Sequence, residues 1–470
     1  VPACRPCRRR LTGKESMTDW IGADSEKLTA AYAAQEASPV AVAEALFEHM
    51  AAQDEALGAV RVLSREAALE SAAASERRWR RHAPQSPLDG VPVMVREDIA
   101  LPSYANEVEG VSPAVARLLE AGCVVLGKTV MAAHDAVVAG RCIEGRLVRN
   151  PWQPALTTGG SSAGAAVACA AGYAPLHVAI DRIGSLRMPA AFCGVFGFKP
   201  TQGRVPLAAP AIGRVAGPIT RSVHDAAAMM NILARPDDRD FACLPPESPE
   251  YRMRVDGMSP KSLTIAVLTD MGVGPAVDPA IRLAVQEAAR ALQTAGASVE
   301  MIDGFLDPEM FESMQMLLEA GAHRDLEAMG EHERVRLPGF VVDWAGRRAP
   351  GFSGPQVMQA LADIVRMRAA INEAMMGYDY LLMPVSPVLP WAAGSLSPTN
   401  DPQDGLPHVA FTVPWNFAEH PAASLNWRHG ADGVPVGVQV VGHRFDDLGV
   451  LRLSRTLEIM RPEQAGWPLG

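Results

Sequence analysis

The stretch that most constrains the fold is residues 157–172, which read TTGGSSAGAAVACAAG. Two glycines run into two serines, and the chain then becomes almost wholly small and apolar. A helix that is apolar on every side is buried in the protein. Glycine permits tight turns, so the segment before the helix can present its hydroxyl groups at the helix start. The stretch therefore predicts a buried helix that follows a flexible polar turn.

Helices alternate with short strands along the chain. Ser38 followed by Pro39 is a helix start, and apolar residues recur at helical spacing after it. The segments GVPVMVRED and CVVLGKT read as strands on either side of a helix that ends at Gly122. Further helices are predicted around 279–296 and 354–376. Such alternation predicts an α/β fold.

The composition indicates a soluble globular protein. Of 470 residues, 48% are hydrophobic and 20% charged, and no run approaches the ~18 consecutive apolar residues of a membrane span. A net charge of -10 argues against nucleic acid as a direct partner, because phosphate binding depends on clusters of Lys and Arg. No apolar stretch follows the arginine run near the start, which disfavours an export signal. We expect a cytoplasmic protein that does not contact membranes.

We expect residues 17–470 to form a single domain and residues 1–16 to be a disordered or added leader, because Met17 fits a natural start. The seven cysteines are odd in number and scattered, which is typical of a reduced cytosolic chain. Cys4 and Cys7 form one CxxC without a second pair, so we expect no zinc there. We predict no metal and no organic cofactor, because ligand spacings and phosphate-binding fingerprints are absent from the sequence.

The Gly-Ser turn alone leaves two other readings. A phosphate cradle would need GK[ST] after its glycines, or GxGxxG directly after a strand, and neither is present. A plain loop before a core helix stays open on this segment alone. The reading changes at residues 181–206, which continue as DRIGSLRMPAAFCGVFGFKPTQGRVP.

Together these segments resemble the amidase signature family. That family has a Gly-Gly-Ser-Ser turn, then Asp-x-Gly-Gly-Ser-[Ile/Leu]-Arg-x-Pro-Ala, Gly-[Leu/Phe]-Lys-Pro-Thr and Gly-Arg-Val-Pro. The same order is kept here by GGSS at 159–162, DRIGSLRMPA at 181–190, GFKPT at 197–201 and GRVP at 203–206. Further likenesses such as LDGVPV and PVGVQVVG extend the resemblance over about residues 20–460.

The resemblance implies a large, twisted, mixed and mostly parallel sheet sandwiched between helix layers. It also implies hydrolysis of a small amide or related C–N bond by a Ser-cisSer-Lys triad. By motif position, Ser185 is the nucleophile and Ser161 is the bridging serine, which passes a proton from the nucleophile to the base. The turn formed by Arg182, Ile183 and Gly184 offers its N–H groups to the developing oxyanion.

Other residues of the two motifs are expected to support the site. Asp181 and Arg187 flank the nucleophile turn, and we expect a buried ion pair, since either charge alone would be costly to bury. Gly160 belongs to the turn before the bridging serine. Ser162 is expected to cap the turn or the helix and not to react.

The base of the family is missing. The lysine of the family lies six residues after the Gly of Gly-Val-Pro, here Gly90, and Arg96 occupies that position. A guanidinium keeps its proton, because its pKa stays above about 12 in proteins. Arg96 can donate hydrogen bonds or hold an anion, but it cannot accept the proton of Ser161. Among the five lysines, Lys128 and Lys199 lie at motif positions that look structural.

Further departures affect the same region. Glu97 stands where the family has Asp after its lysine. Ile183 replaces a glycine, and if the turn needs the positive φ of glycine, one oxyanion donor is misaimed. Residues 100–110 lack the Thr-Thr-x-Gly-Ser loop of the family, and His134, after GKT, is expected to be structural and not a substitute base.

Two functions follow, and the sequence leaves both open. The first is an amide hydrolase acting through Ser185, with weak or altered activity because of Arg96. The second is a catalytically inactive amidase-like protein that serves as a binding or partner subunit. The corresponding component of a tRNA-dependent amidotransferase is a third possibility, but it needs a normal lysine and fits less well. The expected ligand is a small amide or carboxylate, and a homodimer stays open.

The motif spacing also predicts the geometry of the site. We expect the hydroxyls of Ser161 and Ser185 to lie within hydrogen-bond reach of each other in a cleft, with Arg96 close to Ser161.

Overall fold

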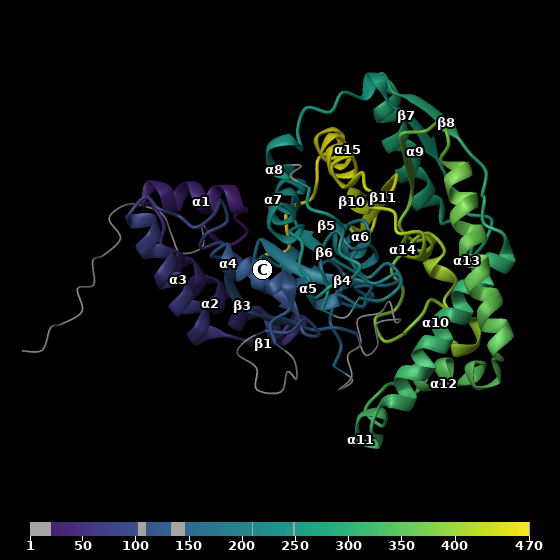
Figure 1. Cartoon of the computed structure of the whole chain (residues 1–470). Coiled ribbons are helices and arrows are strands. Elements are labelled where there is room, and N and C mark those ends of the chain that lie inside the picture. Colours follow the sequence, from purple (N-terminus) through teal and green to yellow (C-terminus); the bar gives the residue numbers. More distant parts are fainter. Residues whose placement is uncertain (1–19, 102–109, 133–145, 209, 248–249, 470) are drawn as a thin grey trace, which may run out of the picture.

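The computed structural model describes residues 20–101, 110–132, 146–208, 210–247 and 250–469. The proposed leader, the CxxC near the start, His134 and most of the loop at 100–110 lie outside the described residues. A large twisted sheet runs through the middle of the molecule with helices on both sides (Figure 1).

Within the described residues, eleven strands form one sheet in the order β1-β3-β2-β4-β6-β5-β10-β11-β9-β7-β8. The strands of the middle are buried along their whole length, which explains their near-continuous apolar sequences. The bounds are β1 (Val60–Leu63), β2 (Pro92–Arg96), β3 (Val124–Thr129), β4 (Leu176–Asp181), β5 (Phe196–Lys199), β6 (Val215–Thr220), β7 (Thr264–Val267), β8 (Ser298–Met301), β9 (Tyr380–Pro384), β10 (Ala422–His429) and β11 (Pro435–Gly442).

The expectation of a mostly parallel sheet is wrong. Of the ten strand pairs in the described residues, six are antiparallel and four are parallel. The parallel pairs lie toward the two ends of the sheet, in β3-β2-β4 and β9-β7-β8. In the middle, β10 and β11 form a hairpin, which needs only a short connection. The alternation of helices and strands in the sequence does not report the direction of such central strands.

Helices cover both faces of the sheet. A Cβ on Gly437 of β11 would lie 2.8 Å from the Cβ of Ala191 in α6, whereas a Cβ on Gly442 would lie 2.6 Å from Val450 in α15. Because alternate residues of a strand face opposite sides, α6 and α15 lie on opposite faces. The helices are α1 (Ser25–Ala34), α2 (Pro39–Leu57), α3 (Arg65–Arg80), α4 (Pro113–Glu120), α5 (Ala163–Ala170), α6 (Arg187–Cys193), α7 (Val223–Leu233), α8 (Tyr251–Arg254), α9 (Pro279–Thr294), α10 (Pro308–Ala328), α11 (Glu331–Arg334), α12 (Gly339–Arg347), α13 (Gly354–Ala374), α14 (Val413–Phe417) and α15 (Asp447–Met460).

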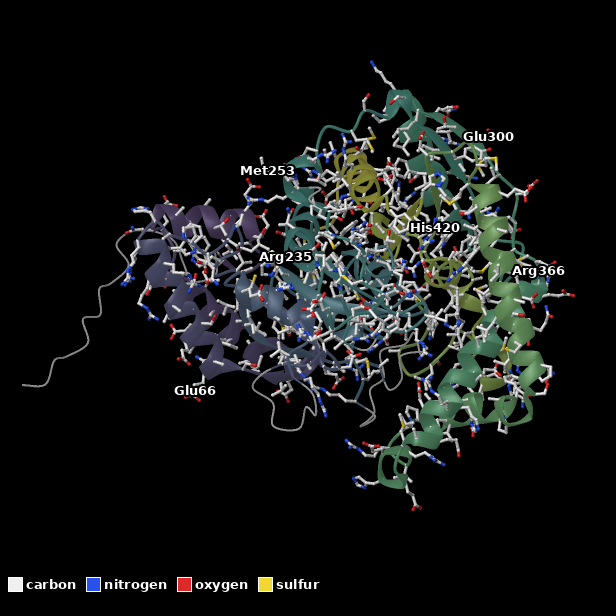
Figure 2. The ribbon with its side chains drawn as sticks, viewed as in Figure 1. Glu66, Arg235, Met253, Glu300, Arg366 and His420 are labelled. Atoms are coloured by element: carbon white, nitrogen blue, oxygen red, sulfur yellow. The ribbon has the colours of Figure 1, made fainter. Side chains whose placement is uncertain are left out.

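The outer helices lie at two opposite ends of the molecule. Helices α1 to α3 lie at one end, and α10 to α13 project at the other (Figure 1). Glu66 of α3 and Arg366 of α13 point away from the molecule, whereas His420 lies in its interior (Figure 2). In the part of the chain that the structure describes, no helix is long and apolar enough to cross a membrane.

The predicted buried helix is α5. All eight of its residues are buried. A Cβ on Gly164 would lie 2.5 Å from the carbonyl oxygen of Ala59 and 2.6 Å from the amide nitrogen of Val130, so the helix lies directly against other backbone. Since α5 packs on β2, β3, β4 and β6, the Gly-Ser turn at its start is held at the centre of the sheet.

Predicted helix starts agree with the structure. The hydroxyl of Ser38 accepts from the N–H groups of Val40 and Ala41 at the start of α2. Helices α9 and α13 begin at the predicted residues 279 and 354 and end two residues before the predicted ends. These signals are local in the sequence, which is why they could be read without the fold.

Candidate active site

The ends of two neighbouring strands carry the predicted site. Strands β2 and β4 run parallel side by side, with Val95 opposite Val178, so their carboxyl ends lie at the same edge. Strand β2 ends at Arg96 and β4 ends at Asp181, and the nucleophile turn follows β4 directly. Helix α5 packs on both strands and brings the Gly-Ser turn to this edge.

The two serines of the motifs are in contact. The hydroxyl of Ser161 donates to the Oγ of Ser185 at 3.1 Å, and both side chains are fully buried. The peptide bond between Gly160 and Ser161 is cis. This is the contact that the motif spacing predicts. The predicted cleft around the serines stays a prediction.

Arg96 lies beside the serines and is fully buried. Its Nη1 donates to Ser161 Oγ at 2.9 Å, to Ser162 Oγ at 3.2 Å and to the carbonyl oxygen of Ile180 at 3.0 Å. Three acceptors around one nitrogen suit an ammonium group, which has three donors. The Nη1 of Arg96 therefore occupies a place suited to the lysine nitrogen of the family.

The carboxylate partner of Arg96 is Asp98. The Nε and Nη2 of Arg96 bind the two oxygens of Asp98 at 2.7 and 2.6 Å, whereas Glu97 pairs with Arg61. Asp98 also accepts from Arg214 at 3.1 Å. The side chains of Asp98 and Arg214 are 20% and 24% exposed, so polar contacts run from the buried serines toward the surface. The available signal for Asp98 was its i, i+2 spacing from Arg96 at the strand end.

Ser162 does not cap α5 as expected. It holds the N-cap position, but its side chain makes no capping hydrogen bond. Its hydroxyl instead donates to the carbonyl oxygen of Ile180 at 3.1 Å and accepts from Arg96. The buried guanidinium competes with the helix amides for this oxygen.

Asp181 and Arg187 form the predicted buried ion pair. Arg187 Nε and Nη2 donate to the two oxygens of Asp181 at 3.0 and 3.1 Å. Burial raises the pKa of Asp181, but the charge and hydrogen bonds of Arg187, with bonds from Asn416 and the Leu186 N–H, hold that pKa below its ordinary value. The ionised carboxylate also accepts from the Gly184 N–H at 2.7 Å, so it fixes the nucleophile turn.

Sequence reasoning missed the far side of this ion pair. Arg187 also donates to Asn416 Oδ1 at 2.6 Å, to Gln439 Oε1 at 2.9 Å and to the carbonyl oxygen of Thr412 at 3.0 Å. These residues follow Arg187 by more than 200 positions. Their signal was a polar residue in each of two apolar segments, FTVPWNF and PVGVQVVG.

The nucleophile turn does not strain Ile183. Among the described residues, Ile183 is not one of those with positive φ, and Gly184 adopts φ 121° instead. The expected misaiming of a donor by Ile183 is therefore not supported by its backbone. The N–H groups of Ile183 and Ser185 donate to no atom of the described residues. Both are available to an oxyanion beside the serine.

Arg182 contributes to the turn through its backbone alone. Its side chain points to α10, where Nη1 lies 3.8 Å from the Oδ2 of Asp325. A Cβ on Gly321 would lie 2.8 Å from Nη2, so α10 passes close to this guanidinium. The turn is thus tied to the helices that project at one end of the molecule.

Replacing Gly184 by alanine should destabilise the protein. The added Cβ would lie 2.5 Å from Thr412 Oγ1, and the residue would keep φ at 121°. We expect a loss of about 2 kcal/mol or more in the free energy of unfolding, measured by urea denaturation. Gly213→Ala is the matched control, because it has φ 76° but its nearest contact is at 3.5 Å, and it should lose about 1–2 kcal/mol from backbone strain alone. Equal losses in the two variants would contradict the close contact with Thr412.

The comparison with known families follows from this geometry. The profile of the family named Amidase matches residues 41–451. The chain belongs to the amidase family. The match spans both serine loops and Arg96, and it confirms the resemblance found in the motifs.

Relatives of this amidase-family chain cover nearly all of it. The GatA-type component of the glutamyl-tRNA(Gln) amidotransferase of Picosynechococcus sp. is 29% identical over 472 residues, which cover 90% of this chain and 95% of the relative. The acylamidase of Rhodococcus erythropolis is 29% identical over 476 residues, 95% and 97% of the two chains. The family and these relatives support an amide C–N hydrolase.

Solved structures confirm the α/β amidase-signature fold. A bacterial aryl acylamidase of the amidase signature family matches with a TM-score of 0.86 and 26% identity, over 95% of this chain and 97% of the other. A 6-aminohexanoate cyclic dimer hydrolase in complex with substrate matches with a TM-score of 0.83 and 25% identity, over 94% and 98%.

The buried lysines of this amidase-family chain have partners of their own. Burial lowers the pKa of Lys128, and its Nζ donates to the carbonyl oxygen of Glu97 at 3.1 Å. Burial, with the charge of Arg187, lowers the pKa of Lys199 to about 7, and its Nζ donates to the carbonyl oxygen of Pro200 at 3.0 Å. Neither of these hydrogen bonds reaches a serine of the site.

The hydrogen bonds of the site run in one direction. Arg96 donates to Ser161, and Ser161 donates to Ser185. Because a guanidinium only donates, a proton that leaves Ser185 finds no acceptor on Arg96. The arrangement stabilises negative charge on the serine oxygens, which is a different task from removing a proton.

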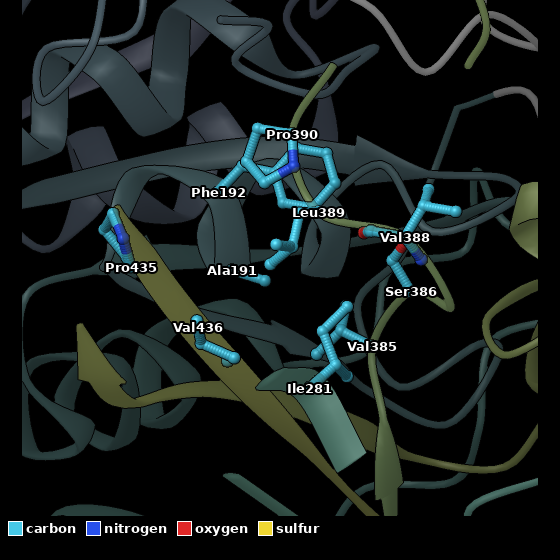
Figure 3. Close-up of a pocket in the computed structure, with 11 residues that line it drawn as sticks. Ala191, Phe192, Ile281, Val385, Ser386, Val388, Leu389, Pro390, Pro435 and Val436 are labelled. Carbon is cyan, nitrogen blue, oxygen red and sulfur yellow. The ribbon is translucent and has the colours of Figure 1, made fainter. Parts of the chain in front are cut away.

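Other hollows in the described residues lie away from the serines. One apolar pocket of about 10 Å³ is lined by residues such as Phe192, Leu389 and Val436 (Figure 3). A larger hollow of about 430 Å³ is lined by Arg117 and residues 236–239. Within the described residues, no cluster of three or more His, Cys, Asp or Glu side chains could hold a metal ion.

Proposed function

We propose that this chain is an amide hydrolase in which Ser185 attacks the acyl carbon and Arg96 supplies fixed positive charge in place of a base. The observation that carries the proposal is the buried, hydrogen-bonded series from Arg96 through Ser161 to Ser185. It lies beside the two amide N–H groups of Ile183 and Ser185 that have no partner in the described residues. The named acylamidase relatives support the reaction class.

Acylation then takes place without a basic side chain. The Ser185 oxygen bonds to the acyl carbon, and the C–N bond breaks. The proton of Ser185 passes to Ser161, whose own proton moves to the leaving nitrogen, so that a neutral amine departs. Arg96 stays charged and stabilises the negative charge that passes through Ser161. Water then adds to the acyl group, which releases the acid and restores the Ser185 hydroxyl.

Without a base, the leaving group decides the rate. A general base typically contributes about 10²–10⁴ to the rate, and its loss weighs most on substrates whose leaving group must be protonated as it departs. Esters and aryl amides have weakly basic leaving groups, whereas alkyl amides do not. We therefore assign amides and esters with weakly basic leaving groups, such as aryl amides, as the substrate class.

A matched acyl series tests this proposal. We expect the wild type to hydrolyse 4-nitrophenyl butyrate faster than 4-nitrobutyranilide, and both faster than butyramide, with a total spread of at least about 10². The readout is kcat/KM for each substrate. Ser185→Ala is the blank. Butyramide hydrolysed as fast as the ester, and lost in Ser185→Ala, would show that a working base is present.

Binding without turnover is the second candidate function. The one-way hydrogen bonds from Arg96 favour it, since they suit an anion or a carbonyl oxygen better than proton removal. In that case no substrate of the series is hydrolysed in a Ser185-dependent way. Carboxylates and neutral amides would still raise the melting temperature, and amines would not, because ligands that bind the folded state stabilise it.

The relatives named as amidotransferase components suggest a role within a larger assembly as a further reading. We place it last, because release of ammonia from glutamine needs the lysine that Arg96 replaces. We also propose that residues 17–470 form one domain. This is supported by a single contiguous core of buried residues that runs from Trp20 to Leu457.

A further inference from the structure

Two buried histidines have no hydrogen-bond partner for either ring nitrogen among the described residues. They are His177 and His408, and both are fully buried. Buried polar side chains nearly always have a partner, so each exception needs an explanation. The surroundings of the two imidazoles differ, and only those of His408 lead to the candidate active site.

One contact of His408 leads to the loop of Ser161. His408 lies in the short 3-10 turn Pro407–Val409. Its ring packs edge-on against Trp391, with the ring centroids 5.2 Å apart and an interplanar angle of 70°. The carbonyl oxygen of Trp391 accepts from the Thr157 N–H at 2.6 Å. Thr157 begins the Gly-Ser turn, so Trp391 is anchored four residues before Ser161.

The chain after His408 leads to the loop of Ser185. The Thr412 N–H donates to the carbonyl oxygen of Val409 at 2.9 Å, which closes one turn of chain after His408. The hydroxyl of Thr412 donates to the carbonyl oxygen of Ile183 at 2.6 Å. His408 is therefore held between two segments, each tied to the loop of one site serine.

The small pocket of Figure 3 does not explain the unpartnered nitrogens. Phe192 lines that pocket and also packs edge-on against Trp391, with the ring centroids 5.8 Å apart. The pocket has a volume of about 10 Å³ and its lining includes neither Trp391 nor His408. A volume of about 10–15 Å³ corresponds to one water molecule and not to a group of a substrate.

The chemistry of His408 selects the ligand. Burial lowers the pKa of His408 to about 3, so the imidazole is neutral at ordinary pH. A neutral imidazole offers one donor and one acceptor. A carboxylate brings no donor and an ammonium brings no acceptor, whereas an amide brings one of each. An amide is also planar, as is the indole of Trp391 beside it.

We propose that His408 and Trp391 form a subsite for a second, uncleaved amide group of the substrate. The subsite lies between the two serine loops, so it receives a group on the same molecule as the bond at Ser185. This inference rests on the proposed function of that serine, and it adds the substrate class: compounds with a cleavable bond and a separate neutral amide.

Binding to the Ser185→Ala protein tests the subsite without turnover. The probes are two pairs of compounds that differ by one carboxamide: acetanilide against 4-acetamidobenzamide, and benzamide against terephthalamide. Calorimetry should show that the carboxamide-bearing member of at least one pair binds about tenfold more tightly, as expected for added neutral hydrogen bonds. If neither pair shows a preference, the proposal is overturned.

Variants then assign the preference to His408. His408→Leu in the same background should abolish the preference, and His408→Gln, which keeps a donor and an acceptor, should retain part of it. His177→Leu is the matched control, because His177 is equally buried with a pKa of about 3 but lies four residues before Asp181 along β4. It should keep the full preference. A preference that survives in His408→Leu, or that is lost equally in His177→Leu, would overturn the assignment.

The two proposals fail in different measurements. Loss of the carboxamide preference with intact Ser185-dependent hydrolysis removes only the subsite. An intact preference in a protein that hydrolyses no substrate removes only the proposed reaction.

Discussion

Replacing Arg96 by lysine should raise kcat/KM for butyramide by about 10²–10⁴, the usual contribution of a general base. The Nη1 of Arg96 lies within 3.2 Å of three acceptors, Ser161, Ser162 and the carbonyl oxygen of Ile180. A lysine nitrogen in that place has three donors when charged, and it can accept the proton of Ser161 when neutral. The rate for the nitrophenyl ester should change much less, because its leaving group needs no proton.

Three variants control this experiment. Arg96→Met removes the charge without adding a base and should not gain activity. Ser185→Ala in the lysine background must abolish any gain. Ile183→Gly should add nothing, because Ile183 does not need a positive φ in this turn. Amide hydrolysis by the wild type that depends on Ser185 and falls in Arg96→Lys would show that Arg96 belongs to a working site.

Replacing Arg187 by methionine should lower the free energy of unfolding by about 3–5 kcal/mol. The change leaves the carboxylate of Asp181 buried without its main counter-charge, and it removes the bonds to Asn416, Gln439 and Thr412. Urea denaturation measures the loss.

An exposed ion pair is the matched control. Arg324→Met breaks a pair with Asp325 in which the arginine side chain is 77% exposed, and it should cost less than about 1 kcal/mol. The double variant Asp181→Leu with Arg187→Met should recover part of the stability, because it removes both charges. A loss in Arg187→Met no larger than in the exposed control would contradict a structural role for the buried pair.

The sequence was sufficient for features that are encoded locally. The start of α2 depends on Ser38 and Pro39, and the burial of α5 depends on its own composition. The contact between Ser161 and Ser185 could be predicted because each serine is part of a motif whose spacing is known from the family.

Features that depend on distant segments could not be predicted in this way. The direction of β10 depends on its pairing with β5 and β11, not on its own residues. The polar network around Arg187 is completed by Asn416 and Gln439, which the fold alone brings to α6. Ser162 has the sequence of a helix cap, but a buried guanidinium that approaches from β2 redirects its hydroxyl.

The two-sided engagement of Arg96 also has an evolutionary consequence. One edge of the guanidinium holds the serine loop, and the other holds both oxygens of Asp98. A reversion to lysine would restore a nitrogen beside the serines but would leave Asp98 with Arg214 as its remaining arginine partner in the described residues. The arginine is therefore entrenched: its replacement becomes acceptable only after a change at Asp98, so the two positions form an epistatic pair that slows the return to the ancestral triad.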